Sequence, residues 1–512
     1  MLQEHEVETS SAVRLPSVYR DSVTWAIVVV AFGAYTVISL FRLLQLDPSS
    51  WDLGIFTEYV KQYAHFHAPI VDIRGAGTNL WGDHFSPAVA AVAPFFRVFP
   101  SAGTLLVAQA LLVAASVFPV AQGARALTGV GPARAIALAY GFCWGLQQMI
   151  NFDFHEIAIA VPLLAFALSA LIEGRVRATV CWALPLVFVK EDQGFTVAAI
   201  GFYLLMSGLR TEVSDRAKAR AGIILMLWGV AWSFLAIAVI IPHFNASHTY
   251  YYWGDGGAFA PGGHPSVGAL ISQFFHAWPQ KLETLVLLLL PTAFLALRSP
   301  VALIALPSLG LRFESTNSAY WGTAWHYNAT VMPILFVAAI DGLVRLRASR
   351  DDAGATWEAW ANGQLGWRRA ALAGAERYGV AMMVAVTVPF AFQYPLSGLW
   401  SGQTYRISPH VAADNAAMAE VPDGASVLTT LNMLASLGAR TDTYWIGNRG
   451  NPDTEYIVFD GPDSGYSTPI ANVPSFIASL YPGNVYTQIF ADNGVYVFRR
   501  TTQASRLGLL LE

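Results

Sequence analysis

Charged residues are scarce in this sequence. Its 512 residues include 30 Lys and Arg and 34 Asp and Glu, so 12% of the chain is charged, about half of the share in an average soluble protein. So few charges cannot cover a soluble surface, and this excludes an ordinary cytosolic enzyme. The hydrophobic content of 55% excludes a disordered chain. The net charge of −4 excludes a nucleic-acid partner, because binding to phosphates needs an excess of cations.

Cysteine is also nearly absent. The two cysteines, Cys143 and Cys181, both lie in apolar stretches. Two residues are too few for a disulfide framework, and they cannot form a zinc site by themselves. We interpret both as small hydrophobic side chains that are buried in the protein.

Long uncharged runs dominate the rest of the sequence. A membrane-spanning helix needs about 20 mostly apolar residues, and Ser22–Phe41 supplies the first such run. Further uncharged runs occur at 98–124, 135–152, 157–172, 178–189, 193–209, 221–254, 284–297, 299–311, 315–340 and 378–405. They predict an all-α polytopic membrane protein with about 11 transmembrane helices. Three of the runs (178–189, 284–297 and 299–311) are short, so each is expected to be a half-helix or to include flanking polar residues.

Lys and Arg are distributed unequally between the two sides of the predicted membrane. Cytoplasmic connections of membrane proteins carry the excess of these residues. Here the connections on the side of the N-terminus hold most of them. An odd number of crossings then places the N-terminal segment 1–22 in the cytoplasm and the C-terminal residues outside. We expect a multi-pass protein of the inner (plasma) membrane, in contact with membrane lipids.

The outer side of the predicted membrane is rich in ionisable residues. Most of the 11 histidines fall there, with several carboxylates and two aromatic clusters, HTYYYW at 248–253 and YWGTAWHY at 320–327. Aromatic belts are common at membrane interfaces, but a belt needs neither His nor Asp. Ionisable residues at membrane depth usually mark a functional site. We therefore expect one shared polar cavity near the outer leaflet.

The first outer loop, 46–86, contains a stretch with helical periodicity. From Leu53 to Phe66 apolar residues recur on one face, and polar residues such as Glu58 and Lys61 lie opposite. This pattern predicts an amphipathic helix on the membrane surface. Asp52 directly precedes the stretch, so it is either the N-cap of the helix or a catalytic carboxylate. The two roles are compatible.

Three further groups of polar residues lie at helix junctions. Each group has a structural interpretation (a turn, a helix cap or an internal ion pair) and a functional one in the polar cavity. The groups are Asp83 and His84 at the end of the first loop, Asp153, His155 and Glu156 after the third predicted helix, and Lys190, Glu191 and Asp192 between two short apolar runs. In the functional interpretation Lys190 binds phosphate as a compact point charge.

Four short motifs carry a family resemblance: WDLGIF at 51–56, GDHFSP at 82–87, NFDFHE at 151–156 and VKEDQG at 189–194. In this order they resemble a bacterial and archaeal family of predicted membrane proteins of unknown function, which looks like a branch of the GT-C glycosyltransferases. The resemblance covers roughly residues 23–346. It implies a GT-C-like transmembrane domain at 23–396, followed by a family-typical extracytoplasmic tail.

GT-C enzymes use lipid-phosphate-linked sugars on the outer face, with a catalytic Asp soon after the first helix. The resemblance therefore implies a glycosyltransferase that moves a sugar from a polyprenyl-phosphate donor to a glycan, lipid or protein acceptor. Asp52 and Phe56 resemble the D-x-x-x-aromatic pattern of the lipid A and protein mannosyl branches. The sequence departs from those branches at Leu53, where they have Glu, and at 83–87, where they have a Lys-Pro-Pro-like segment.

The implied reaction assigns a role to each group. Asp52 is the general base that takes the proton of the acceptor hydroxyl, and a single displacement inverts the anomeric carbon. Cations must meet the leaving polyprenyl phosphate. The candidates for this are His84, His155 and Lys190, with Arg42 and Arg312 as weaker ones, and the supporting polar residues are Asp83, Asp153, Glu156, Glu191 and Asp192.

No cofactor is expected with certainty, but a divalent Mg or Mn ion is left open, held by Asp52, Asp83, Asp153 or His155. Two other functions also stay open. A transporter or flippase of lipid-linked glycans would need broken helices and ionisable groups at the bilayer midplane. A non-catalytic scaffold for envelope assembly would not require the polar residues to converge.

The segment 397–512 has ordinary polarity and many turn residues. We predict a helix at 411–419 and strands at 426–430, 456–460, 485–490 and 495–499. Asp492-Asn493-Gly494 fits a tight hairpin turn between the last two strands. The segment is therefore expected to be a small extracytoplasmic α/β domain, and no catalytic group stands out in it.

Overall fold

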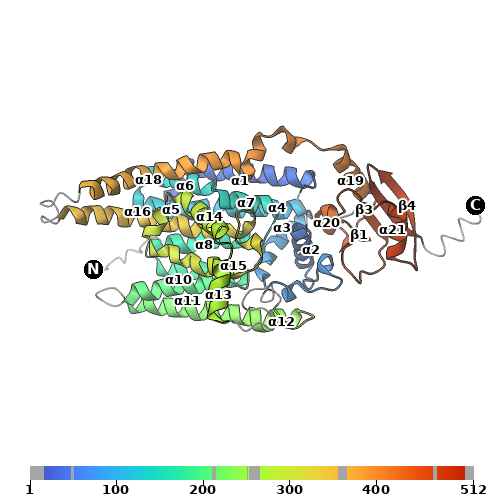
Figure 1. Ribbon diagram of the computed structural model, residues 1–512, viewed down its shortest axis with the longest axis horizontal. Coiled ribbons are helices and arrows are strands. Elements are labelled where there is room, and N and C mark those ends of the chain that lie inside the picture. Colours follow the sequence, from blue (N-terminus) through green and yellow to red (C-terminus); the bar gives the residue numbers. More distant parts are fainter. Residues whose placement is uncertain are drawn as a thin grey trace, which may run out of the picture.

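The computed structural model describes residues 17–47, 51–209, 215–250, 252, 266–355, 366–464 and 470–501. It has an elongated helical body with a five-stranded sheet domain at one end of the long axis (Figure 1). The prediction of a mostly helical protein with a small C-terminal sheet is therefore confirmed. Most of the expected N-terminal cytoplasmic segment, 1–16, lies outside the described residues.

The helical body extends from α1 (Ser22–Leu44) to α18 (Gly366–Gln393). Between them lie α2 (Trp51–Ala64), α3 (Ala93–Val98), α4 (Ala102–Ala115), α5 (Val117–Thr128), α6 (Val130–Gly141), α7 (Trp144–Phe152), α8 (Ile157–Ile172), α9 (Val176–Ala183), α10 (Gln193–Leu209), α11 (Arg216–Leu235), α12 (Ile241–Phe244), α13 (Val267–Phe275), α14 (Trp278–Leu289), α15 (Leu306–Glu314) and α16 (Val331–Ala355). Short 3-10 turns join many of them.

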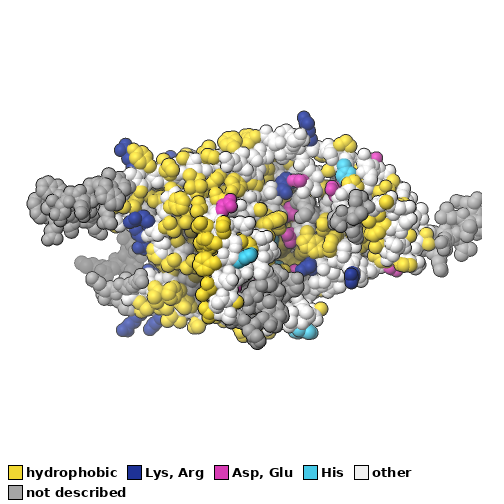
Figure 2. Space-filling view, viewed as in Figure 1, with side chains coloured by type: hydrophobic (Ala, Val, Ile, Leu, Met, Phe, Trp, Pro, Cys, Tyr) yellow, Lys and Arg dark blue, Asp and Glu magenta, His cyan; other side chains and the backbone are white. Residues whose placement is uncertain are grey.

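Four helical segments of the described chain are long and apolar enough to cross a membrane: Ser22–Leu44, Ala102–Thr128, Arg216–Phe244 and His326–Ser349. The last is 83% buried and forms the centre of the body, whereas Arg216–Phe244 is 22% buried and lies at its edge. Figure 2 shows hydrophobic side chains over the surface of the body, bordered by Lys and Arg at the end far from the sheet domain. An exposed apolar surface of this extent needs lipid around it.

Several of the predicted spans are broken by proline or by left-handed backbone. The run 178–189 consists of α9 and the 3-10 turn Leu184–Phe188, which has a proline at its start. The run 284–297 is interrupted after α14, where Ala293 and Phe294 have φ of 48° and 57°. Proline removes a helical hydrogen bond and clashes with the preceding turn. The short runs are thus helical pieces, and the number of crossings stays a prediction.

The two cysteines differ in environment. Cys143 is buried, as predicted, whereas Cys181 is exposed. The prediction is wrong for Cys181 because its side of α9 is not covered by the rest of the described chain. A residue in an apolar stretch of a membrane protein need not pack against protein, since lipid accepts the same side chains.

Helix α2 differs from the amphipathic surface helix that the sequence predicts. It begins at Trp51, so Asp52 lies in its first turn and is not its N-cap. Leu53 through Val60 are all buried. Helix α2 packs against α20 (Leu434–Gly438) of the sheet domain and against α3 of the helical body. The prediction is wrong because both sides of the helix are covered by protein, which buries even Glu58 to 1% exposure.

The sheet domain has the strand order β2-β1-β3-β5-β4. Its elements are α19 (Pro409–Ala419), β1 (Ser426–Thr429), α20, β2 (Asp442–Trp445), β3 (Tyr456–Asp460), α21 (Val473–Leu480), β4 (Val485–Asp492) and β5 (Val495–Thr501). Strand β1 pairs in parallel with β2 and β3, and β5 pairs antiparallel with β3 and β4. The four predicted strands are confirmed, whereas the short β2 was missed. Asn493 and Gly494 have φ of 46° and 84°, as a tight hairpin turn requires.

Candidate functional site

A cavity of about 310 Å³ lies among α2, α10 and α15. It is lined by six residues that the sequence singles out: Asp52, His84, His155, Lys190, Glu191 and Asp192. These residues come from α2, the first loop, the α7–α8 junction and the start of α10, so segments far apart in the sequence converge on one space. Asp83, Asp153 and Glu156 are not part of the lining.

Helix α2 brings Asp52 to the cavity through Phe56. Residues four apart in a helix share a face, and the Phe56 ring packs against the rings of Phe154 and His155, with centroid distances of 5.5 and 5.2 Å. One turn earlier, Asp52 lines the cavity. Burial raises the pKa of the Asp52 carboxyl, and the opposing charge of His155 does not cancel this shift. A carboxylate with a raised pKa is a better proton acceptor than an exposed aspartate.

Glu156 lies behind the lining and contacts two of its residues. Its side chain is fully buried, and its carboxylate is 2.5 Å from Nδ1 of His155 and 2.8 Å from Nζ of Lys190. Burial alone would raise the pKa of Glu156, but His155 and Lys190 outweigh it and keep the pKa well below its usual range. Lys190 thus forms an ion pair, but its partner is Glu156 of a distant segment and not an acidic residue of the 190–192 group itself.

His84 is held by a second buried carboxylate. Its Nδ1 is 2.7 Å from Oε1 of Glu191, which also accepts a hydrogen bond of 3.0 Å from the hydroxyl of Tyr250. The His84 ring stacks on Tyr252 with centroids 4.4 Å apart. Burial and Lys190 lower the pKa of His84, but the Glu191 carboxylate reverses the effect and raises it. Glu191 thus favours the protonated form of His84.

Asp83, Asp153 and Asp192 lie in three different environments. Asp83 accepts hydrogen bonds from Nε of Arg74 at 3.1 Å and from the hydroxyl of Tyr252 at 2.9 Å, so it fixes the first loop. Asp153 is buried and has φ of 105°. Asp192 faces the cavity, and burial raises the pKa of its carboxyl although Lys190 opposes the shift. Asp83 and Asp153 therefore support the walls, and Asp192 is part of the lining.

Arg312 and His326 also line the cavity. Neither forms an ion pair with a carboxylate of the described residues. Arg312 donates to the carbonyl oxygens of Tyr320 and Tyr327 and to Oδ1 of Asn328. His326 is 2% exposed and stacks on His155 with ring centroids 3.7 Å apart. Neither ring nitrogen of His326 has a hydrogen-bond partner within the described chain.

A family model described as "Predicted membrane protein (DUF2079)" matches residues 42–471, most of the chain. The chain belongs to this family. The match confirms the resemblance of the four motifs. It includes the whole cavity lining and much of the sheet domain, so the family is defined by more than the transmembrane part.

Two crystal structures of ArnT from Cupriavidus metallidurans are similar to this DUF2079 protein. One is bound to undecaprenyl phosphate, with 13% identity, a TM-score of 0.48 and coverage of 94% of this chain and 99% of that chain. The other is in the apo state, with 14% identity, the same TM-score of 0.48 and coverage of 92% and 97%. Neither likeness identifies an activity, because both the identity and the TM-score are low. No curated protein matches the sequence.

The sequence underrated the lining cation that forms no ion pair with a carboxylate of the described residues. Arg312 ranked as a weak phosphate candidate, and His326 was placed on the outer face without a role. The signal was the cluster YWGTAWHY at 320–327, whose backbone carbonyls bind the Arg312 guanidinium. Arg42, the other weak candidate, pairs with Asp47 at 3.3 Å and contacts Asn151, outside the lining.

Proposed function

We propose that this DUF2079 protein is a GT-C-like membrane glycosyltransferase. It transfers a sugar from a polyprenyl-phosphate-linked donor to a glycan, lipid or protein acceptor of the cell envelope. The donor lipid stays in the bilayer, and the reaction takes place on the outer face of the inner membrane. The proposal combines the family motifs at 51–56, 82–87, 151–156 and 189–194 with the chemistry of the cavity.

The proposal rests on one observation: which charged side chains of the cavity form ion pairs with carboxylates and which do not. Glu156 matches His155 and Lys190, and Glu191 matches His84. Among the described lining residues, this leaves the Arg312 cation without a carboxylate partner and Asp52 with a raised pKa. An unmatched cation favours an anionic ligand such as phosphate, and a carboxyl of raised pKa favours proton acceptance. A sugar phosphate binds the unpaired cation, and an alcohol gives its proton to the carboxyl of raised pKa.

The reaction is a single displacement. Asp52 takes the proton of the acceptor hydroxyl as the acceptor oxygen attacks the anomeric carbon. The bond between that carbon and the phosphate oxygen breaks, and the electron pair leaves with polyprenyl phosphate. The new glycosidic bond has inverted configuration. The leaving phosphate gains negative charge, which Arg312, His155, Lys190 and His84 stabilise in a water-poor site.

No step of the proposed reaction uses the Mg or Mn ion that the sequence leaves open. Of the residues considered for it, Asp52 and His155 line the cavity, whereas Asp83 is bonded to Arg74 and Tyr252 and Asp153 is outside the lining. A Mg or Mn ion would thus have two protein ligands there. Mg²⁺ and Mn²⁺ are therefore added to the assay as separate conditions.

The test uses purified protein in lipid nanodiscs with a panel of polyprenyl-phosphate sugars and a membrane glycan extract. Release of polyprenyl phosphate is measured for the wild type, Asp52→Asn and the matched control Asp47→Asn, whose carboxylate is 60% exposed and paired with Arg42. We expect release by the wild type and the control, and loss of release with retained donor binding in Asp52→Asn. Equal release by all three removes Asp52 from the mechanism.

A flippase gives a different result in the same nanodiscs and in vesicles. It moves the lipid-linked sugar across the bilayer without releasing polyprenyl phosphate, and Asp52→Asn has no proton-transfer step to lose. Transbilayer movement without release, from any donor of the panel, would replace the transferase proposal. A scaffold would show neither movement nor release, and it would bind no donor in the cavity.

A further inference from the structure

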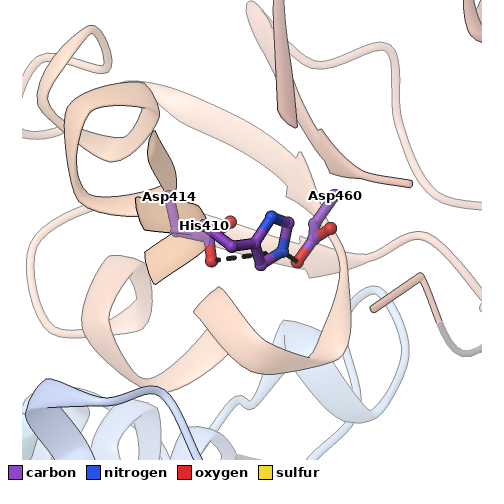
Figure 3. A group of neighbouring side chains, drawn as sticks. All are labelled: His410, Asp414 and Asp460. Carbon is purple, nitrogen blue, oxygen red and sulfur yellow. Dashed lines mark hydrogen bonds and ion pairs between the residues drawn. The ribbon is translucent and has the colours of Figure 1, made fainter. Parts of the chain in front are cut away.

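A second cluster of ionisable side chains lies in the sheet domain, apart from the cavity described above. His410 and Asp414 are one turn apart on α19, and Asp460 is the last residue of β3. Figure 3 shows the three side chains pointing toward one another. One ligand atom from each lies within 4.8 Å of the others, and this is the one such group among the described residues.

The imidazole of His410 is oriented by the backbone. Its Nδ1 is 3.0 Å from the carbonyl oxygen of Asn493, at the tip of the β4–β5 hairpin. A carbonyl can only accept, so Nδ1 carries the proton and Nε2 faces the carboxylates. Histidines that bind metals are held in this way, with the second ring nitrogen donating to a carbonyl or carboxylate.

Three carboxylates face Nε2 of His410. The distances are 3.1 Å to Oδ2 of Asp460 and 3.8 Å to Oδ2 of both Asp414 and Asp463. Two ligands of a tetrahedral zinc ion, at about 2.1 Å from the metal, are about 3.4 Å apart. The observed spacing brackets this value, whereas 3.8 Å is too long for a hydrogen bond.

Carboxylates outnumber cations in this cluster. Asp414 and Asp460 are 1% and 0% exposed, and among the described residues they form ion pairs with His410 alone. Oδ1 of Asp414 is buried without a hydrogen-bond partner in the described chain. Buried carboxylates are normally paired with cations or bound to metals, so one imidazole leaves this cluster short of positive charge.

Asp460 is held as a metal ligand would be. Nδ2 of Asn432 donates to its Oδ2 at 2.7 Å, and the backbone N–H of Asp463 donates to its Oδ1 at 3.1 Å. Such hydrogen bonds orient ligating carboxylates. Asp463 is 66% exposed on its side chain and closes the cluster on the solvent side.

We propose that His410, Asp414, Asp460 and Asp463 bind one divalent metal ion of the zinc type. One imidazole nitrogen with carboxylate oxygens suits Zn²⁺ or Mn²⁺ better than Ca²⁺, which takes oxygen ligands only. The ion ties α19, which follows the transmembrane part, to β3 and to the β4–β5 hairpin. Its role is structural and independent of the proposed glycosyl transfer.

The experiment uses the full-length protein in detergent, treated with a chelator and dialysed. Zn²⁺ and, separately, Mn²⁺ and Ca²⁺ are titrated by calorimetry, and bound metal is counted by mass spectrometry. The variants are His410→Gln and Asp414→Asn, with Asp442→Asn, an exposed aspartate on β2, as the matched control. We expect one Zn²⁺ per chain for the wild type and the control, weaker Mn²⁺ binding and no Ca²⁺ binding.

Both cluster variants should weaken Zn²⁺ binding at least a hundredfold, and Zn²⁺ should raise the melting temperature of the wild type but not of these variants. If the variants unfold in detergent, the Zn²⁺ titration of the wild type still tests the proposal. Absence of stoichiometric Zn²⁺ binding by the wild type would mean that His410 is an imidazolium paired with Asp460, and it would overturn the proposal. Zn²⁺ binding that survives in both variants would overturn it equally.

Discussion

Nζ of Lys190 lies 2.8 Å from a carboxylate oxygen of Glu156, which is fully buried. The same carboxylate also contacts His155, so one acidic residue outside the lining neutralises the Lys190 ammonium and contacts a histidine of the lining. A cation that is already matched attracts a phosphate less strongly than an unmatched one. We therefore expect Arg312, whose partners are carbonyl and amide oxygens, to bind a phosphate more strongly than Lys190 does.

Arg312 is therefore expected to dominate phosphate binding. Arg312→Gln should weaken the affinity for polyprenyl phosphate about tenfold to a hundredfold, since a hydrogen bond to a charged group contributes about 1.5–3 kcal/mol. Arg312→Lys should recover part of the loss. The matched control is Arg42→Gln, because Arg42 pairs with Asp47 outside the lining. Binding is measured by calorimetry in nanodiscs, and equal losses in Arg312→Gln and Arg42→Gln would contradict this assignment.

The Lys190–Glu156 pair should behave as one unit in stability. Glu156→Gln leaves the largely buried ammonium of Lys190 without its carboxylate partner, and Lys190→Met leaves a buried carboxylate with one partner. Removing one member of a buried pair costs about 3–5 kcal/mol, so each single variant should melt markedly earlier. The double variant should recover much of the loss, which gives a coupling of about 2 kcal/mol in a double-mutant cycle. Strictly additive losses would show that the two groups act separately.

Glu58 should make the stability of the α2 region depend on pH. Burial raises its pKa to about 7, against the opposing charge of Lys61, and its Oε2 accepts a hydrogen bond from the backbone of Ile73 at 3.0 Å. The folded state then binds the proton more tightly than the unfolded state, so stability falls as pH rises from about 4.5 to 7. The shift corresponds to about 3 kcal/mol at most.

The check compares melting temperatures of the wild type and Glu58→Gln between pH 4.5 and 8. Glutamine keeps an oxygen for the Ile73 N–H and does not ionise. Glu58→Gln should therefore melt later than the wild type at pH 8 and close to it at pH 4.5. A difference that does not change with pH would assign the effect to packing alone.

The crossing of α10 and α11 should tolerate no side chain at its glycines. A Cβ atom on Gly229 would lie 2.2 Å from the carbonyl oxygen of Gly194, which closely follows the Lys190–Asp192 segment. Gly229→Ala must push the helices apart and should destabilise the protein by about 1–3 kcal/mol. Gly33→Ala on α1, where nothing lies within 4 Å, is the control and should be neutral or slightly stabilising. Thermal unfolding measures both.

Some of the candidate site was predictable because its signals are local. Asp52 and Phe56 are four residues apart, so helical periodicity alone places them on one face. The motifs at 82–87, 151–156 and 189–194 each place ionisable residues at a break between apolar runs, where a membrane protein can expose them to a cavity. The partner of Lys190 was not predictable, because its acidic neighbours Glu191 and Asp192 were equally plausible on sequence alone.

The metal cluster was even less predictable from the sequence than the partner of Lys190. His410 and Asp414 are separated by one helical turn, but Asp460 is 50 residues from His410 and Asn493 lies on a third element. The pairing of β3 with β5 and the packing of α19 against these strands bring the groups together. A spacing of four residues between His and Asp is too common to indicate a metal site without that arrangement.

By itself, the sequence determined the membrane class, the family and four of the five strands of the C-terminal domain, because hydrophobic content, short motifs and strand or turn patterns are properties of continuous segments. The tertiary structure decided which charges are matched, that α2 is buried between two parts of the chain, and which polar groups share a cavity. The reason is physical: a buried charge is governed by the groups within a few ångströms, and in this protein those groups come from distant parts of the chain.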